Sequence, residues 1–231
     1  MRLLQRYPVL LFDMHGVLMF GHDRFGEHED FFRSYRALGG TCLSARDVDV
    51  AIRRCFAGMR ADYDDPARFD DFPSVREGLA RYARVPESEL SRLEIVFALH
   101  ECGLIPDACA AMLARLARSH RLGLVSDVWA PKYLWQREFE RAGISDLFTH
   151  TVFSSDTRSI KPSSRLFREG LRGLGAEPSE ALFVGDSLMR DIEGAKRLGI
   201  RTVWISEAGG GASGAVDYVL RHVTELETLE A

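Results

Sequence analysis

A short apolar run near the start of the chain ends directly at a carboxylate. Residues 8–13 close on Asp13, and Gly16 follows three residues later. A run of this length bounded by turn residues predicts a buried strand. Open α/β sheets bind their ligands at the carboxyl ends of strands, and a carboxylate buried there costs free energy unless a cation or several donors meet it. Asp13 is therefore either a functional group or a turn cap that accepts backbone N–H groups.

The hydrophobic pattern after residue 120 alternates between short strands and amphipathic helices. The expected strands are 121–126, 147–153, 181–185 and 201–205, with a further candidate at 216–220, and the expected helices are 131–142, 163–174 and 188–198. Strands that alternate with helices imply a parallel sheet covered by helices on both faces. The predicted fold class is therefore α/β, with a doubly wound, Rossmann-like core.

The stretch between the first strand and this alternating region differs in character, because its apolar residues recur at helical spacing. Helices are expected from residue 31 to 38, after Ser44, and at 74–84, 87–101 and 107–119. We predict an α/β core domain of residues 1–19 and 106–231, with an all-helical cap domain of residues 20–105 inserted between its halves. Residues 62–73 are predicted as an acidic surface loop, and the glycine run 209–214 as a flexible one.

The composition is that of an ordinary soluble protein and argues against several kinds of partner. Of the 231 residues, 46% are hydrophobic and 28% are charged, and the formal net charge is −4. A chain with this balance and no basic block is a poor partner for nucleic acid or for an anionic membrane. The four cysteines form no C-x-x-C pair, no apolar run has membrane-spanning length, and no signal peptide is recognisable. We expect a cytoplasmic monomer or homodimer with reduced thiols.

Polar residues that suit phosphate chemistry recur where the predicted strands end. They are Asp13, Ser126 with Asp127, Lys161 before Pro162, and Asp186 with Asp191. In a doubly wound sheet these positions share one edge. Each could instead be a turn cap, a helix cap or a surface lysine, but their joint occurrence in this order favours a functional site.

The residue types at this edge are those that phosphoryl transfer requires. Asp13 and Asp186 are hard oxygen ligands suited to Mg²⁺, which prefers a few carboxylates together with water and phosphate. Ser126 can donate a hydrogen bond to a phosphoryl oxygen, and Lys161 can neutralise both the attacking and the transferred group. Asp13 would then act as the nucleophile and form an aspartyl-phosphate.

These motifs resemble those of the haloacid dehalogenase superfamily, in the branch of phosphatases that carry a helical cap. The resemblance covers residues 8–18 and about 120–206. Its most specific segment is Gly-Asp-Ser-Leu-Met-Arg-Asp-Ile-Glu-Gly-Ala, which contains Asp186 and Asp191. The resemblance implies that Asp13 is the nucleophile, that Asp186 binds Mg²⁺, and that Asp191 supports the metal directly or through water.

The same resemblance brings further residues to the expected site. The backbone carbonyl of His15 would be another Mg²⁺ ligand, and Ser126 and Lys161 match the positions that bind phosphate. Asp127, beside Ser126, is a further candidate for the substrate-binding set. His22 lies in the loop where a cap hinge would face the substrate, although a solvated hinge is the alternative.

Two positions depart from the family pattern. His15 stands where phosphatases of the family carry a second Asp, which protonates the leaving oxygen and later activates water. An imidazole has a pKa of about 6.5 against about 3.9 for Asp, and a nearby Mg²⁺ and Lys161 should lower it. We expect a neutral His15 that could act as a base but would be a poor acid. The second departure is Asp127, where many relatives have Asn, and it adds negative charge near the phosphate site.

Three functions stay open on the sequence alone. The first is an Mg²⁺-dependent hydrolase that transfers a phosphoryl group from a small phosphorylated metabolite to Asp13 and then to water. The second is a metal-free, dehalogenase-like hydrolase, because relatives that attack carbon also lack the second Asp. The presence of Asp186 and Asp191 argues against this second function. The third is a catalytically impaired protein that binds a phosphorylated ligand or another protein, and His15 motivates it.

Overall fold

A single sheet of six parallel strands organises residues 3–209 and 216–229, the part of the chain that the computed structural model describes. The strands are β1 (Val9–Phe12), β2 (Arg121–Ser126), β3 (Phe148–Phe153), β4 (Ala181–Gly185), β5 (Arg201–Ile205) and β6 (Tyr218–Leu220). Their order across the sheet is β3-β2-β1-β4-β5-β6. This is the order of a doubly wound sheet, so the predicted α/β, Rossmann-like fold class is confirmed.

The first strand lies in the middle of the sheet, and its four apolar residues are fully buried. β1 pairs with β2 on one side and with β4 on the other, so that Phe12 lies opposite both Leu124 and Val184. Successive side chains of a strand point to opposite faces of a sheet. Alternate residues of β1 therefore belong to two separate hydrophobic cores, one on each face.

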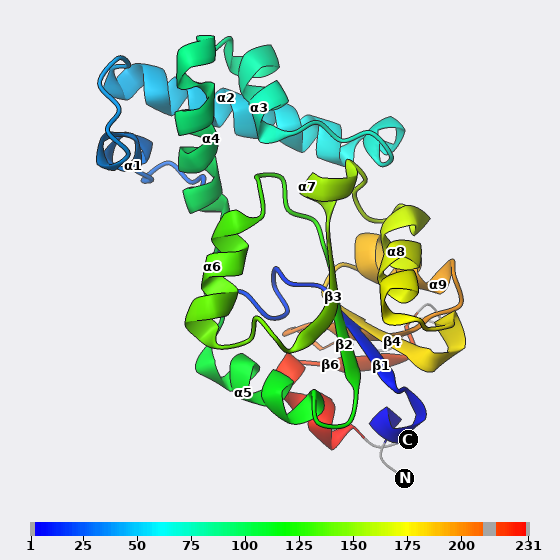
Figure 1. Cartoon of the computed structure of the whole chain (residues 1–231). Helices are drawn as coiled ribbons and strands as arrows, with labels where there is room; N and C mark the ends of the chain where they lie inside the picture. The colour runs from blue at the N-terminus through cyan, green and yellow to red at the C-terminus, as the bar shows by residue number, and fades with distance from the viewer. Residues whose placement is uncertain (1–2, 210–215, 230–231) are drawn as a thin grey trace.

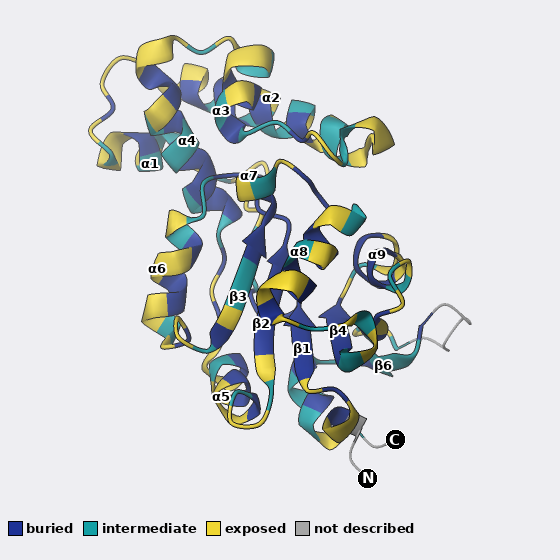
Figure 2. Cartoon of the chain, turned by 45° about the vertical axis from the view of Figure 1, so that its right-hand side comes forward, coloured by how far each residue is buried: buried dark blue, intermediate teal, exposed yellow. Residues whose placement is uncertain are grey.

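Helices cover both faces of the sheet (Figure 1). One core includes residues of α5 (Asp107–Leu116) and α6 (Tyr133–Ala142), and the other includes residues of α8 (Ser164–Leu174) and α9 (Glu193–Lys196). Figure 2 shows the strands buried between these helices, whose outer faces are exposed. The remaining short helical segments outside the region between β1 and β2 are η1 (Leu3–Arg6), α7 (Ser154–Thr157), η4 (Pro178–Glu180), η5 (Leu188–Ile192) and η6 (Val223–Thr228).

Of the five α-helices between β1 and β2, four lie beyond the carboxyl ends of the strands, at the top of Figure 1. They are α1 (Phe31–Ala37), α2 (Ala45–Asp64), α3 (Val75–Gly78) and α4 (Glu87–Glu101), with the short turns η2 (Pro66–Arg68) and η3 (Leu79–Ala83), and we call this group the helical insert. Its core contains fully buried side chains such as Ile52 of α2 and Phe97 of α4. The role of the insert as a cap, and the domain boundaries at residues 20 and 105, stay predictions.

The helix α2 is longer than the sequence pattern indicated. It begins where Ser44 forms a capping box with the third residue of the helix. It continues to Asp64, because Pro66 restricts the preceding residue, Asp65, to an extended conformation. The acidic loop predicted at 62–73 is therefore helical in its first three residues, and it contains the 3₁₀ turn η2 after the end of α2.

The predicted helix at 188–198 is irregular at its start. Its first five residues form the π-helical turn η5, and α9 follows directly. Such turns are frequent at functional sites, and this one carries Asp191. The glycine run predicted as a loop lies, from residue 210 to residue 214, outside the described residues. No helix of the described chain is both long and apolar enough to cross a membrane.

Candidate active site

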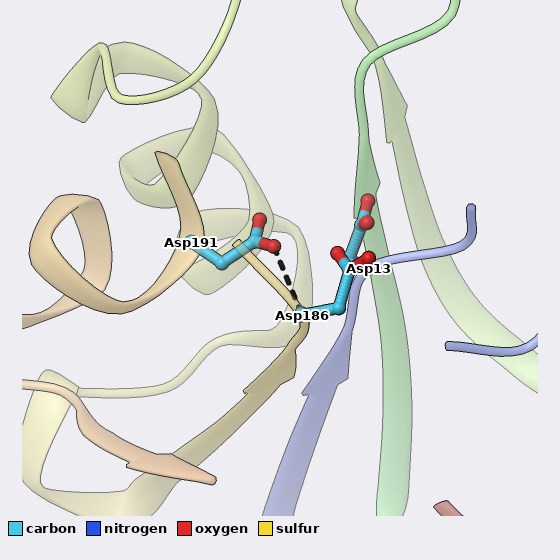
Figure 3. A group of neighbouring side chains, drawn as sticks. All are labelled: Asp13, Asp186 and Asp191. Atoms are coloured by element: carbon cyan, nitrogen blue, oxygen red, sulfur yellow. Dashed lines mark hydrogen bonds between the residues drawn. The ribbon is translucent and has the colours of Figure 1, made fainter. Parts of the chain in front are cut away.

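Three carboxylates meet where β1 and β4 end. Asp13 follows β1, Asp186 follows β4, and Asp191 lies in the π-helical turn beyond it. The two strands are neighbours in register, so their carboxyl ends lie side by side. Ligand oxygens of the three residues all lie within 4.8 Å of one another, and Figure 3 shows the three side chains grouped at this edge.

One buried lysine is bonded to two of these carboxylates. The Nζ atom of Lys161 lies 2.6 Å from Oδ1 of Asp13 and 2.6 Å from Oδ1 of Asp191. Burial by itself would lower the pKa of this lysine, but attraction to Asp13 and Asp191 outweighs burial and raises the pKa above its ordinary value. The ammonium group is therefore charged at physiological pH, as the predicted role of Lys161 requires.

The carboxylates carry more negative charge than Lys161 can neutralise. Burial raises the pKa of Asp13 and of Asp191 in spite of the lysine. Burial, together with repulsion from Asp13 and Asp191, raises the pKa of Asp186 to about 7. Burial and mutual repulsion both disfavour the charged carboxylates, and a bound cation would offset both. Carboxylate oxygens this close together are the hard ligands that Mg²⁺ prefers, so the donor set fits the predicted divalent cation.

The loops approach this closely because two positions are glycine. Gly16 has a φ of +74°, and a Cβ atom added to it would lie 2.2 Å from Oδ2 of Asp186. A Cβ atom added to Gly185 would lie 2.4 Å from Cβ of Asp191. The backbone N–H groups of Asp186 and Ser187 donate to Oδ2 of Asp191, at 3.1 and 2.9 Å. The glycines thus leave room for carboxylates that the backbone itself orients.

The neighbours of His15 define its hydrogen-bonding state. Nε1 of Trp135, on α6, donates to Nε2 of His15 at 3.1 Å. An indole N–H can only donate, so a neutral His15 carries its proton on Nδ1. The ring of His22 stacks on that of His15 with centroids 4.4 Å apart. Burial first, and then His22 and Lys161, lower the pKa of His15 well below its ordinary value, in agreement with the expected neutral ring. Because its Nε2 lone pair is engaged, this ring presents a donor rather than a base.

The two candidate phosphate-binding residues after Val125 have different surroundings. Ser126 is fully buried, and its Oγ atom has no hydrogen-bond partner among residues 3–209 and 216–229. Both carboxylate oxygens of Asp127 accept hydrogen bonds, Oδ1 from the backbone N–H of Lys161 and Oδ2 from the hydroxyl of Tyr63, each at 2.9 Å. Protein donors therefore meet the extra negative charge of Asp127, and the geometry favours a structural role for it over contact with phosphate.

The site opens into a cavity of about 280 Å³ between the sheet edge and the helical insert. The core contributes the predicted residues Asp13, His15, Asp127, Lys161, Asp186 and Asp191 to its lining. Its other wall includes His22, Asp23, Arg60, Tyr63 and Glu101. His22 lines the cavity, and its contact with a substrate stays a prediction. A volume of this size suits a small metabolite.

Glu101 is a buried carboxylate of this wall that no sequence pattern indicated. Its oxygens accept the backbone N–H groups of Trp129 and Ala130, at 2.6 and 2.9 Å. Burial and repulsion from Asp23 raise the pKa of Glu101 to about 8, although the two N–H groups oppose the shift. Glu101 therefore ties the end of α4 to the loop that follows β2.

Two further lining residues, Tyr63 and Arg190, join the insert to the core. The guanidinium of Arg190 donates to the backbone oxygen of Lys161 and to that of Tyr63, each at 2.6 Å. Arg190 lies inside the most specific sequence motif, which was the only available signal for it. Tyr63 lies in the acidic segment, where an aromatic residue is also typical of ordinary surface anchoring.

Comparisons with known proteins place these features in a family. The model of haloacid dehalogenase-like hydrolases matches residues 7–199. A glyceraldehyde 3-phosphate phosphatase of Methanopyrus kandleri is 34% identical over 132 residues, 55% of this chain and 55% of the relative. A phosphoserine phosphatase of Thermus thermophilus is 30% identical over 131 residues, 56% of this chain and 52% of the relative. The chain spans about half the length of the curated relatives it matches.

Solved structures match over almost the whole chain. A HAD phosphatase from Thermococcus onnurineus has a TM-score of 0.62 at 26% identity, and the match covers 95% of this chain and 96% of that one. A 2-haloacid dehalogenase from Pseudomonas syringae pv. Tomato has a TM-score of 0.69 at 21% identity with the same coverage, which shows the fold alone. With a family match that spans most of its length, this chain belongs to the haloacid dehalogenase-like hydrolases.

Proposed function

We propose that the protein is an Mg²⁺-dependent phosphatase that acts on a small phosphorylated metabolite. The observation that carries the proposal is the cluster in which buried Lys161 lies 2.6 Å from buried Asp13 and Asp191, with the exposed Asp186 beside them. The two relatives reported above are named for the removal of phosphate from small molecules. The cavity beside the cluster, about 280 Å³, has room for a leaving group of that size.

We assign each carboxylate a role around the metal. Asp13 and Asp186 would hold Mg²⁺, with the backbone carbonyl of His15 as a further ligand. When bound, the ion supplies positive charge that neutralises phosphoryl oxygens next to an attacking carboxylate. Asp191 already accepts hydrogen bonds from Lys161 and from two backbone N–H groups. It is therefore suited to orient Lys161, and it could support the metal directly or through water.

The reaction proceeds in two displacements at phosphorus. In the first, an oxygen of Asp13 attacks the phosphorus atom, and the bond from phosphorus to the leaving oxygen breaks with its electron pair on that oxygen. Lys161 offsets the charge that accumulates on the transferred group. In the second, a water oxygen attacks the same phosphorus, the bond to Asp13 breaks, and inorganic phosphate departs with the proton lost by the water released to solvent.

His15 determines which leaving groups the first step can expel. A neutral imidazole with its proton on Nδ1 can donate a hydrogen bond, but it is too weak an acid to complete a proton transfer to an alkoxide. Leaving groups that depart without protonation avoid this limit. Aryl and acyl phosphates should therefore be hydrolysed faster than alkyl phosphates.

Release of inorganic phosphate tests the proposal directly. With Mg²⁺ we expect p-nitrophenyl phosphate and acetyl phosphate to be hydrolysed at least about tenfold faster than glycerol phosphate, and we expect EDTA to stop all three reactions. Failure to release phosphate from any of them in an Mg²⁺-dependent manner would contradict the proposal. Chloride release from 2-chloropropionate that EDTA leaves unchanged would support a dehalogenase instead.

The variant His15→Asp separates a specialised enzyme from an impaired one. Because a carboxylic acid can protonate the leaving oxygen, we expect this variant to hydrolyse glycerol phosphate faster than the natural protein. If only the variant were active, on every substrate, the natural protein would be a binding protein rather than a phosphatase.

A further inference from the structure

One link between the helical insert and Lys161 passes through the carboxylate of Asp127. The hydroxyl of Tyr63, on α2, donates to Oδ2 of Asp127 at 2.9 Å. Oδ1 of the same carboxylate accepts the backbone N–H of Lys161, also at 2.9 Å. Asp127 and Lys161 are 8% and 3% exposed, so water competes little for these bonds. A displacement of Tyr63 would therefore move the carboxylate of Asp127 and, with it, the backbone N–H of Lys161.

Arg190 closes this connection into a ring. Its guanidinium donates to the backbone oxygens of Lys161 and Tyr63, each at 2.6 Å. The guanidinium carbon also lies 3.3 Å from the centre of the Tyr63 ring, a distance at which a cation is attracted by the aromatic face. Arg190 precedes Asp191, whose carboxylate holds the Nζ atom of Lys161. The lysine is therefore held at its side chain, its N–H and its carbonyl oxygen.

The chain before Lys161 is paired with the insert as well. The N–H of Ile160 donates to the backbone oxygen of Phe69 at 2.8 Å, and the N–H of Phe72 donates to the backbone oxygen of Arg158 at 2.7 Å. The segment 69–72 of the insert therefore lies against the segment 158–160 that leads to the lysine. These backbone bonds extend the contact made by Tyr63.

We propose that Tyr63 and Arg190 are positioning residues that make the placement of Lys161 depend on the docking of the insert. The role of Lys161 in phosphoryl transfer rests on the function proposed above, whereas the link to the insert rests on these contacts alone. The proposal also explains Asp127. A carboxylate at this position has two oxygens, and they accept one hydrogen bond from Lys161 and one from Tyr63. The carboxylate therefore joins the lysine to the insert.

Tyr63→Phe tests the link with the removal of one oxygen atom. The matched control is Tyr82→Phe, since the hydroxyl of Tyr82 donates to Asp62 within the insert and the residue does not line the cavity. We expect Tyr63→Phe to lower kcat for p-nitrophenyl phosphate about tenfold with KM within about threefold, because Lys161 acts mainly in the transition state. Tyr82→Phe should stay within about twofold of the natural protein in both constants.

Amide hydrogen exchange supplies a measurement that does not depend on turnover. In Tyr63→Phe we expect exchange in the segment 154–163 to be at least about fivefold faster than in the natural protein, with α4 unchanged. In Tyr82→Phe this segment should be unchanged. If the natural protein hydrolyses no phosphate and the segment still exchanges faster only in Tyr63→Phe, the positioning link stands and the proposed function falls.

Two results would overturn the link. One is a Tyr63→Phe protein with unchanged kcat and unchanged exchange at 154–163. The other is an equal loss of kcat in both variants with faster exchange over the whole insert, since that marks general loosening. Arg190→Lys is the second test, because a lysine keeps the charge but has one nitrogen in place of the Nη1 and Nη2 atoms that reach two separate carbonyl oxygens. It should change kcat and exchange in the same direction as Tyr63→Phe, and unchanged values would also overturn the link.

Discussion

The two sides of the cavity are built in different ways. On the core side, Asp13, Lys161 and Asp191 are almost fully buried, and Lys161 is bonded to both carboxylates. On the insert side, Arg60 is half exposed and pairs with Asp64, one turn further along the same helix. The core side is thus held by bonds between distant parts of the sheet edge. On the insert side, Arg60 pairs within its own helix, while Tyr63 and Glu101 bond across to the core. Changes on the core side should stop the chemistry, and changes on the insert side should alter its rate or its substrates.

The largest expected effect comes from Asp13→Asn on the core side. The amide has nearly the shape of the carboxylate but is no nucleophile, so phosphate release should fall about 10³-fold or more. The matched change on the insert side is Asp23→Asn, because Asp23 lines the same cavity. We expect this variant to lose less than about tenfold in kcat/KM, mostly through KM. Steady-state kinetics with p-nitrophenyl phosphate and Mg²⁺ gives both values.

The pair of Asn variants can also contradict the difference in role between the two sides. Equal losses in the two proteins would mean that the insert side takes part in the chemical step. Thermal unfolding of both variants is the control, because a loss of activity counts only in a protein that remains folded.

A second pair of variants tests how closely each side is packed. Gly16→Ala would place a Cβ atom 2.2 Å from Asp186 at a φ of +74°, whereas Gly21→Ala, at a φ of +66°, meets no atom within 4 Å. The positive φ alone costs about 1–2 kcal/mol for alanine, and the clash adds to it. We expect a loss of about 3 kcal/mol or more in the free energy of unfolding for Gly16→Ala and of about 1–2 kcal/mol for Gly21→Ala, measured by urea unfolding.

Mg²⁺ binding separates the two alanine variants further. Because Asp186 must move when residue 16 carries a side chain, Gly16→Ala should weaken Mg²⁺ binding in a calorimetric titration. Gly21→Ala should bind Mg²⁺ as the natural protein does. Equal stability losses with equal Mg²⁺ affinity would show that the approach of the two loops does not matter for the metal.

The core side could be predicted because its information is local in the chain. The strands at 121–126, 181–185 and 201–205 were predicted with their observed bounds, since each is an apolar run between turn residues. Parallel neighbours end at the same edge, so Asp13 and Asp186 could be expected to meet before any coordinates were known. The rules of strand pairing alone predict that these two carboxylates meet, without knowledge of any side-chain contact.

Two contacts, one across the cavity and one within the core, could not be predicted in this way. Tyr63 and Asp127 are 64 residues apart, and Trp135 and His15 are 120 residues apart. Neither bond leaves a periodic pattern in the sequence, because each depends on how the insert or α6 settles against the sheet edge. The hydrogen-bonding state of His15 was beyond reach for the same reason. Its residue type indicated acid–base chemistry, and only the indole beside it shows which nitrogen accepts.

A last comparison concerns two buried glutamates of α4, Glu101 on the cavity wall and Glu89 away from it. The pKa of Glu101 is raised to about 8 by burial and by Asp23, so the folded state binds its proton more tightly than the unfolded state. The stability that this group contributes is present below about pH 4.5 and is lost as the pH rises to about 8, with a slope of at most about 1.4 kcal/mol per pH unit. Glu101→Gln should remove that slope from urea unfolding free energies measured between pH 5 and pH 8.

Glu89→Gln is the matched control, because it makes the same change at a carboxylate whose pKa is shifted in the opposite direction. Burial acts to raise the pKa of Glu89, but hydrogen bonds from Arg92 and Tyr35 outweigh it and the pKa is lowered. Its stabilising contribution is therefore present near neutral pH and is lost as the pH falls through the folded pKa. Glu89→Gln should lose stability near pH 7 and little at acid pH, with the decline toward pH 8 retained. If that decline survived in Glu101→Gln instead, the cavity wall would not be the source of this pH dependence.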